Sequence, residues 1–274
     1  MKTKKYINLA MVAGALSCLQ LGGIARADED KPTAEDKPTA NLAVSALSKY
    51  VWRGFELSKD SIVLQPSATV AYKGFSANVW GNMDTNVYVQ NAEGGGSNNW
   101  TETDLTLAYD WTIGQVGLTA GYIYYSVIGP DTQEVFARAA WHTLLTPTLT
   151  VYRDFDHLAG WYVTLGVSHT LPITEKIGLS LGAQVGYLAA DDASSYAKVN
   201  TTEAYRGFHD GLLTASIAFP VNQYITITPV LNYSFALTEN ARDLIKVNSQ
   251  EILNGGTGGD SNFIYGGGTV TMAF

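Results

Sequence analysis

The chain has 274 residues and a formal net charge of −8, with four histidines and one cysteine. Such an acidic chain is a poor candidate for nucleic-acid binding, and a single cysteine excludes a disulfide framework. Only 15% of the residues are charged, whereas glycine, tyrosine and tryptophan are abundant at 27, 16 and 6 residues.

The first residues have the pattern of a secretory signal peptide. Three lysines within the first five residues precede an apolar run over residues 7–19, and Ala25-Arg26-Ala27 supplies a small-residue cleavage site. The run is too short to cross a bilayer as a helix. We expect residues 1–27 to be removed, and Cys18 with them. Lipidation of Cys18 is the alternative, although Ala15 stands where such a site normally has leucine.

A tandem repeat follows the signal peptide, EDKPTAEDKPTA from Glu29 to Ala40. It is charged, contains proline and lacks large apolar groups, so it predicts a disordered periplasmic leader over residues 28–40. A docking or plug segment in the periplasm is the alternative.

Residues 41–274 alternate between apolar and polar side chains, which is the period of β-strands. In residues 61–73, for example, Ile62 and Leu64 share one face and Gln65 lies on the other. No segment holds 18 consecutive apolar residues, so a passage through a membrane must use strands. The pattern predicts about twelve strands, at residues 41–52, 61–73, 75–84, 101–111, 115–127, 134–143, 148–155, 161–171, 176–188, 209–219, 223–237 and 262–274.

The connections between these strands alternate in length. Links after odd-numbered strands are long, as in RGFELSKD and residues 189–208, and links after even-numbered strands are short, as in Gly74 and PVN. Short periplasmic turns and long outer loops are typical of outer-membrane barrels. We therefore predict an all-β fold, an antiparallel transmembrane β-barrel over residues 41–274. The expected location is the outer membrane of a Gram-negative cell, in contact with its lipid and lipopolysaccharide.

Aromatic residues gather at two levels, near the short turns and near the long loops. This indicates two aromatic belts at the lipid interfaces of a membrane protein. A soluble β-sandwich has no lipid interfaces that would favour two such belts. The rings predicted to lie in these belts are Tyr50, Trp52, Tyr72, Phe75, Tyr109, Trp111, Tyr122, Tyr124, Trp141, Trp161, Tyr187, Phe219, Phe235 and Phe274.

The chain ends in GGGTVTMAF, where Ile264, Val270 and Phe274 share the apolar parity. We expect this last strand to pair with the first and close the barrel. A terminal phenylalanine preceded by alternating apolar residues also resembles the signal that the outer-membrane assembly machinery recognises. That machinery is an expected partner during biogenesis.

The stretch SKYVWRGFELS contains the pattern S-x-Y-x-x-R-G-x-x-x-S, carried by Ser48, Tyr50, Arg53, Gly54 and Ser58. It is followed by Gln65, Lys73-Gly74-Phe75, Trp80 and Asp84. These residues resemble the proteobacterial TorF-like family of small outer-membrane porins. The detailed match covers about the first fifth of residues 28–274, and Glu56 stands where a small polar residue is expected. The resemblance implies a porin-like barrel and no particular substrate or functional residue.

We expect no enzymatic activity. Outer-membrane serine hydrolases place histidine and serine two residues apart on one strand face, and none of the four histidines has a serine two residues beyond it. Ser168 is adjacent to His169, so the two point to opposite faces. Neither zinc-ligand spacing nor a phosphate-binding glycine pattern occurs, so we predict no metal and no cofactor.

The inward parity supplies candidates for the pore lining: Lys49, Arg53, Gln65, Glu102, Asp104, Asp110, Glu134, Arg138, His142 and Asp154. Charges of both signs inside a barrel have two interpretations. They either form ion pairs that hold a closed barrel together or line a water-filled pore and select solutes. Arg53, at the outer mouth, has the same two interpretations.

Barrel size bears on function, because about twelve strands enclose less room than the sixteen to eighteen of general porins. We predict a narrow porin-like channel for passive diffusion of small hydrophilic solutes. A non-conducting structural or ligand-binding barrel is the alternative.

The outer loops hold two further features. The first is a set of acidic residues, which we interpret as solvated side chains; calcium or magnesium bridges from them to lipopolysaccharide are the alternative. These residues are Asp191, Asp192, Glu203, Asp210, Glu239, Asp243, Glu251 and Asp260. The longest loop, residues 238–261, contains Leu244, Val247 and Ile252 and predicts a short helix over 241–253 that ends at glycine. We hypothesise that this loop folds over or into the lumen and narrows it; a disordered loop is the alternative.

Overall fold

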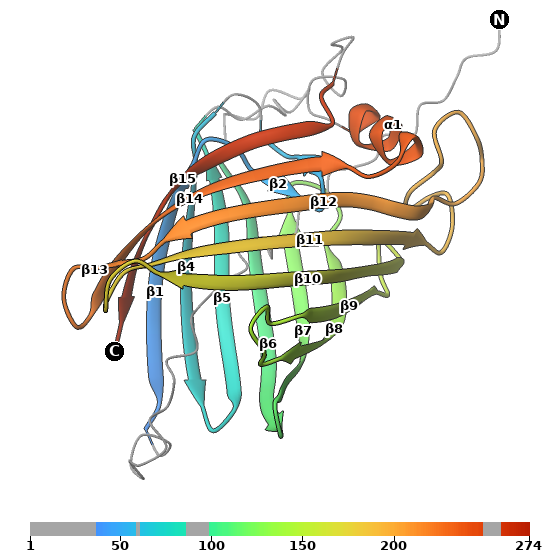
Figure 1. Cartoon of the computed structure of the whole chain (residues 1–274). Helices are drawn as coiled ribbons and strands as arrows, with labels where there is room; N and C mark the ends of the chain where they lie inside the picture. The colour runs from blue at the N-terminus through green and yellow to red at the C-terminus, as the bar shows by residue number, and fades with distance from the viewer. Residues whose placement is uncertain (1–36, 59–60, 86–98, 249–258) are drawn as a thin grey trace, which may run out of the picture.

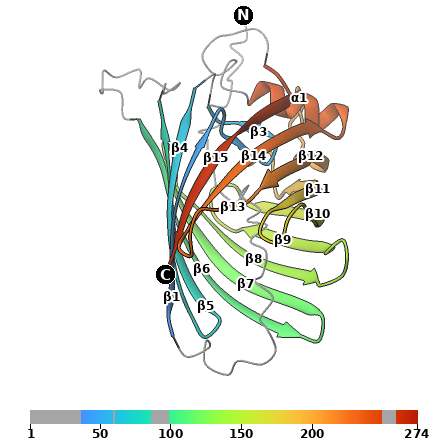
Figure 2. The same ribbon diagram turned by 60° about the vertical axis from the view of Figure 1, so that its left-hand side comes forward.

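The structure, a computed structural model, describes residues 37–58, 61–85, 99–248 and 259–274. The predicted signal peptide and the predicted leader up to residue 36 lie outside the described residues. Twelve long antiparallel strands form a closed barrel, which confirms the predicted fold class (Figures 1 and 2). No helix in these four ranges is long and apolar enough to span a membrane.

The barrel strands follow one another around the ring in chain order, each paired with the next. They are β1 (Thr39–Leu47), β4 (Val63–Tyr72), β5 (Phe75–Asp84), β6 (Trp100–Ile113), β7 (Val116–Val127), β8 (Thr132–Trp141), β9 (Thr148–Asp154), β10 (Gly160–Pro172), β11 (Gly178–Ala190), β12 (Arg206–Ile217), β14 (Ile225–Ala236) and β15 (Asn262–Ala273). A two-residue strand, β13 (Phe219–Pro220), adds to the pairing with β14.

The barrel closes where β15 pairs with β1, as the sequence predicts. Next to this ladder, the N–H of Ala40 donates to the carbonyl of Phe274 at 3.2 Å, and the N–H of Phe274 donates to the carbonyl of Ala40 at 2.8 Å. β1 begins at Thr39, two residues earlier than expected. The reason is that β4 supplies backbone partners for Thr39 and Ala40, and Phe274, the residue after β15, supplies a second partner for Ala40.

β10 shows how alternating residues form the wall. Trp161 and Leu165 are 45% and 56% exposed, whereas Tyr162 and Thr164 are 5% and 4% exposed. Successive side chains of a strand point to opposite faces, so one chain produces an apolar outer surface and a more polar interior. The apolar outer surface is the face that a bilayer covers in a transmembrane barrel.

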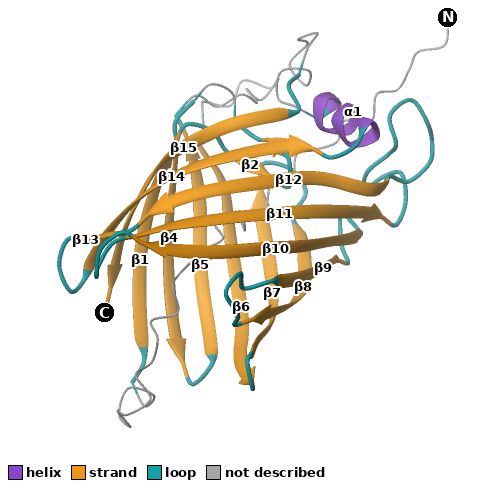
Figure 3. Cartoon of the chain, in the orientation of Figure 1, coloured by secondary structure: helices purple, strands orange, loops and turns teal. Residues whose placement is uncertain are grey.

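Most strands are joined by short turns at one end of the barrel and by longer connections at the other, although the four-residue link from β7 to β8 is shorter than the six-residue link from β8 to β9. β4 and β5 turn through Lys73 and Gly74, whose φ angles are 49° and 84°, the geometry of a two-residue type I′ turn. This turn lies at the same end as the C-terminus, and the helix α1 (Glu239–Val247) lies at the opposite end (Figure 3). The alternation of link lengths in the sequence predicts this asymmetry.

The first predicted strand takes a different course from the one expected. It was predicted to continue to Trp52, but β1 ends at Leu47, and β2 (Val51–Trp52) pairs with β3 (Phe55–Glu56) in a small hairpin. Val51, Trp52 and Phe55 are only 3%, 3% and 4% exposed. Because consecutive large apolar side chains leave neither face of this segment polar, the segment is stable only where both faces are buried, inside the barrel.

The helix α1 lies in the loop for which a helix is predicted, and it ends before the predicted Leu253. Residues 249–258 lie outside the described residues. The hydroxyl of Thr238 accepts from the N–H of Ala241 at 3.2 Å and caps the first turn. Ala241, Leu244 and Ile245 form one buried face, so the helix packs with its apolar side against the barrel.

Candidate functional site: the luminal hairpin

The luminal hairpin, residues 51–56, turns at Arg53 and Gly54. Their φ angles are 48° and 82°, as a type I′ turn requires, but this backbone conformation is uncommon for arginine and costs free energy. A Cβ added to Gly54 would lie 3.0 Å from both the Cβ of Asp210 and Cδ1 of Ile245. The tip of the hairpin is therefore held between β12 and α1.

Arg53 forms an ion pair with Glu134 of β8. Its two terminal nitrogens donate to the two carboxylate oxygens, each at 2.7 Å, and Tyr125 Oη donates to Glu134 Oε2 at 2.8 Å. The Arg53 and Glu134 side chains are only 10% and 2% exposed. Bidentate charge-assisted pairs of this kind are among the strongest hydrogen bonds in proteins. Of the two interpretations of Arg53, the structure shows the pair with an inward acid.

Aromatic rings surround the guanidinium group of Arg53. Its Cζ lies 4.4 Å from the ring centre of Trp52, 4.9 Å from that of Tyr152 and 4.4 Å from that of Tyr162. Ring faces attract a cation more strongly when water is excluded. Burial lowers the pKa of Arg53, but the charge of Glu134 outweighs it and the net shift is upward. Arg53 is therefore a permanent cation in the lumen.

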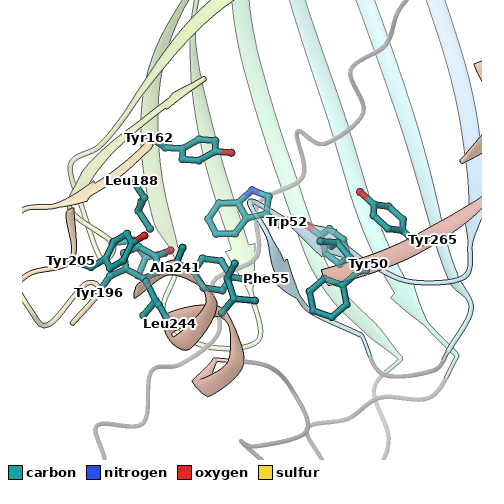
Figure 4. Packing of buried hydrophobic residues seen from close by; sticks show 14 of the residues in the cluster. Tyr50, Trp52, Phe55, Tyr162, Leu188, Tyr196, Tyr205, Ala241, Leu244 and Tyr265 are labelled. Atoms are coloured by element: carbon teal, nitrogen blue, oxygen red, sulfur yellow. The ribbon is translucent and has the colours of Figure 1, made fainter. Parts of the chain in front are cut away.

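A buried apolar cluster surrounds the hairpin at the end of the barrel where α1 lies, which we call the outer end (Figure 4). Phe55 stacks on Tyr196 with ring centres 5.7 Å apart, and its ring centre lies 5.0 Å from that of His209. Leu188 of β11 and Leu244 of α1 belong to the same cluster. The outer end of the barrel is therefore packed rather than open in this conformation.

Hydroxyl groups contact four of the buried acids. Tyr50 donates to Glu102 at 3.1 Å, Tyr125 to Glu134 at 2.8 Å, Tyr162 to Asp210 at 2.9 Å and Thr132 to Asp154 at 2.7 Å. Burial raises the pKa of Tyr50, and the charges of Glu102 and Asp104 raise it further. The Tyr50 hydroxyl therefore keeps its proton and remains a donor.

The predicted pore-lining residues fall into two groups. In the packed outer half, Lys49 pairs with Glu56 at 2.5 Å and Gln65 donates to Asn82 at 3.1 Å. The other members of this group are Arg53, Glu102, Asp104, Glu134 and Asp154, whose contacts are described above or whose side chains are buried. Nearer the short turns, Asp110, Arg138 and His142 are exposed. The lumen therefore changes from accessible to packed along its length.

The structure corrects two of the predicted interface aromatics. Tyr50 and Trp52 are each 3% exposed and lie in the luminal cluster, because the chain leaves the wall after Leu47. Of the remaining rings, nine are well exposed: Tyr72, Phe75, Tyr109, Trp111, Trp141, Trp161, Tyr187, Phe219 and Phe274. Tyr122, Tyr124 and Phe235 are partly exposed. Contact of these rings with lipid stays a prediction.

The outer acidic residues also include one correction. Asp210 was assigned to the outer loops, but it is 4% exposed and faces the lumen beside Tyr162. Asp191 behaves as an outer residue: it accepts from the two terminal nitrogens of Arg153 at 2.9 and 2.6 Å, and this pairing lowers its pKa. Hydrogen bonds from Ser194 lower the pKa of Asp192.

Sequence reasoning missed several residues of this site. Tyr125 and Tyr162 were not singled out, although both have the inward parity of their strands, and Asn82 precedes Asp84 on the same face of β5. An inward tyrosine near a long loop is the signal that identifies Tyr125 and Tyr162. Their partners lie 9 to 48 residues away in the chain, and no local pattern encodes such pairs.

Comparisons with known proteins bear on the fold. No protein-family model and no curated protein matches the chain. Among solved structures, the NanC porin resembles it with a TM-score of 0.52 at 9% identity, over 85% of this chain and 98% of that one. The KdgM porin resembles it with a TM-score of 0.49 at 10% identity, over 87% and 99%. At 9% identity the likeness to NanC shows the barrel fold alone and identifies no solute.

The same comparisons correct one expectation, that the chain is not an enzyme. Structures of OmpT, an outer-membrane protein of Vibrio cholerae, also resemble it, in one case with a TM-score of 0.39 at 8% identity over 87% of this chain and 98% of that one. Because one fold hosts many functions, the expectation of no enzymatic activity is withdrawn.

Proposed function

We propose that the chain is an outer-membrane channel through which small hydrophilic solutes diffuse, with the luminal hairpin as a movable constriction. The observation that carries the proposal is the polar lining near the short turns. Thr69, Asn78 and Thr106 are partly accessible there, and Asp110 and Arg138 are exposed. A barrel that is apolar outside and polar inside is built to hold water in a membrane.

The packed outer half determines when such a channel conducts. Ile123, Tyr125 and Asn82 are 0%, 1% and 2% exposed, so no water-filled passage reaches them in this conformation. Conduction requires the hairpin to move. The packed state also carries costs that favour its opening, namely the positive φ of Arg53 and buried polar atoms without hydrogen-bond partners among the described residues, Glu102 Oε1 and His209 Nε2.

A second candidate function is a non-conducting barrel that stabilises the membrane or binds a ligand at its outer loops. The apolar cluster that joins the hairpin, α1 and the wall favours it, because such a cluster keeps the outer end closed. The two functions make opposite predictions for electrical conductance.

The remaining parts of the proposal concern the setting of the protein. We assign the chain to the TorF-like porins on the Ser48–Ser58 motif, and to the outer membrane of a Gram-negative cell after removal of residues 1–27. Lipopolysaccharide and the barrel assembly machinery are the proposed partners. Mass spectrometry of the mature protein purified from outer membranes tests the location and the cleavage site together.

The test of function is single-channel recording in planar bilayers. The wild type should give discrete steps smaller than those of a general porin. Gly54→Ala should open more often, because its Cβ would lie 3.0 Å from Asp210 and Ile245 at a φ of +82°. Gly268→Ala is the matched control, since its Cβ would meet only Thr228 O at 3.9 Å. Silence of both the wild type and Gly54→Ala, with insertion demonstrated, would leave the non-conducting barrel.

A further inference from the structure

The interior of the outer half is strongly acidic. Among the described residues, seven buried acidic side chains lie there: Glu56, Asp84, Glu102, Asp104, Glu134, Asp154 and Asp210. One lysine and one arginine accompany them, Lys49 and Arg53, which are 22% and 10% exposed, and the imidazole of His209 on β12 is buried beside them. The lumen at this level therefore has a large excess of negative charge whenever its carboxyl groups ionise.

The acids and the two cations Lys49 and Arg53 are divided between the wall and the segment that enters the lumen. Both cations and Glu56 belong to residues 49–56, which form the luminal hairpin and the arm before it. The other six acids lie on five wall strands, β5, β6, β8, β9 and β12, and we call them the acidic belt. No arginine or lysine of a described wall strand faces the lumen at this level; Arg138 lies nearer the short turns and is exposed.

Movement of the hairpin therefore changes the charge of the passage. A hairpin that left its place would carry Arg53 away from Glu134, which Arg53 binds at two points in this conformation. Glu134 also stands directly opposite Asp154 in the register of β8 and β9, and like charges at this spacing repel. An open passage would be lined by carboxylates without the arginine that balances them in the packed state.

Glu102 supplies an independent indication of a missing positive partner. It is 2% exposed, its Oε2 accepts from Tyr50, and its Oε1 has no hydrogen-bond partner among the described residues. A buried carboxylate oxygen without a donor costs free energy. Asp104 lies two residues further on the same face of β6, and its carboxyl group interacts with that of Glu102, so two acids share this part of the lumen. An ammonium group would supply both an N–H donor to this oxygen and a positive charge beside the carboxyl groups.

From these observations we propose that the open channel is cation-selective and takes small cationic solutes, such as compounds with a primary ammonium group, in preference to anions. Glu102 and Asp104 are the residues that determine this selectivity. Rings of acidic side chains select cations in channels because they raise the local cation concentration and repel anions. The inference rests on the proposed function and names the class of solute for it.

The test is the reversal potential in planar bilayers across a KCl gradient. The wild type should favour potassium over chloride. The double variant Glu102→Gln/Asp104→Asn should lower the permeability ratio about two- to fivefold, the scale of removing a charge near the path of an ion. Asp191→Asn/Asp192→Asn is the matched control, because it removes two acids at the exposed outer rim. It should leave the ratio unchanged.

The outcomes separate this inference from the proposed function. Conducting channels with a chloride preference or none would overturn the selectivity while leaving the channel. The absence of conductance would overturn both. If the double variant does not fold, liposome swelling with wild-type protein decides, because L-lysine hydrochloride should then enter faster than sodium L-glutamate. Equal or reversed rates would refute the proposal.

Discussion

Replacing Arg53 with methionine should release the luminal hairpin from the barrel wall. The change removes both charge-assisted hydrogen bonds to Glu134 and leaves its carboxylate, which is 2% exposed, without a cation. Removing one partner of a buried ion pair typically costs about 3–5 kcal/mol. The contacts of the guanidinium with Trp52, Tyr152 and Tyr162 are lost as well. At about 1.4 kcal/mol for each factor of ten, the hairpin should open at least a hundredfold more often.

Hydrogen exchange of one backbone amide measures this opening. The N–H of Leu57 donates to the carbonyl of Tyr50 at 2.8 Å, and this bond can break when the hairpin leaves its place. Its exchange rate should therefore rise in Arg53→Met. Within the barrel wall, the N–H of Ala273 donates to the carbonyl of Tyr224 at 2.9 Å and should keep its exchange rate.

The double variant Arg53→Met/Glu134→Gln distinguishes an ion pair from simple packing. It removes the arginine and the charge that would otherwise be left unpaired, so it should be less destabilising than Arg53→Met alone. The expected coupling between the two sites is about 1–3 kcal/mol. Equal effects of the single and double variants, or an unchanged Leu57 exchange rate in Arg53→Met, would refute the reasoning.

Three further changes test the barrel seam, the last residue and α1. Gly267→Ala should lower the urea midpoint, because its Cβ would lie 1.9 Å from the carbonyl oxygen of Ala46; Gly268→Ala should not, and equal midpoints contradict this explanation. Phe274→Asp should impair insertion, because Phe274 is 63% exposed on the apolar parity and a charge there opposes contact with lipid; normal heat-modifiable migration on gels argues against it. Leu244→Ala should cost about 2–5 kcal/mol in the packing of α1, since Leu244 is 2% exposed, and unchanged protease resistance of the loop contradicts that estimate.

Several parts of the candidate site could be predicted from the sequence and others could not. The inward parity of Glu102, Glu134 and Asp154 follows from counting along alternating strands, and all three are luminal. The prediction that Tyr50 and Trp52 lie at a lipid interface was wrong, because their apolar side chains suit a lipid interface and a barrel interior equally well. Asp210 was misplaced for a related reason, since it lies close to the predicted boundary between strand and loop.

The architecture follows from local patterns in the amino-acid sequence. A polar and an apolar face at every strand suit a wall between water and lipid, and the alternation of short and long links fixes which strands are neighbours and which end carries the turns. These features are local, because each depends on side chains only a few residues apart.

The contents of the lumen depend instead on contacts between residues that are far apart in the chain. Arg53 and Glu134 are 81 residues apart in the chain, and Tyr50 and Glu102 are 52 residues apart. Gly54 meets Asp210 and Ile245 only because β12 and α1 lie beside the hairpin after the barrel has closed. Each of these contacts depends on the curvature of the complete ring of strands, which brings distant residues face to face across the lumen, and no periodicity along the chain encodes that meeting.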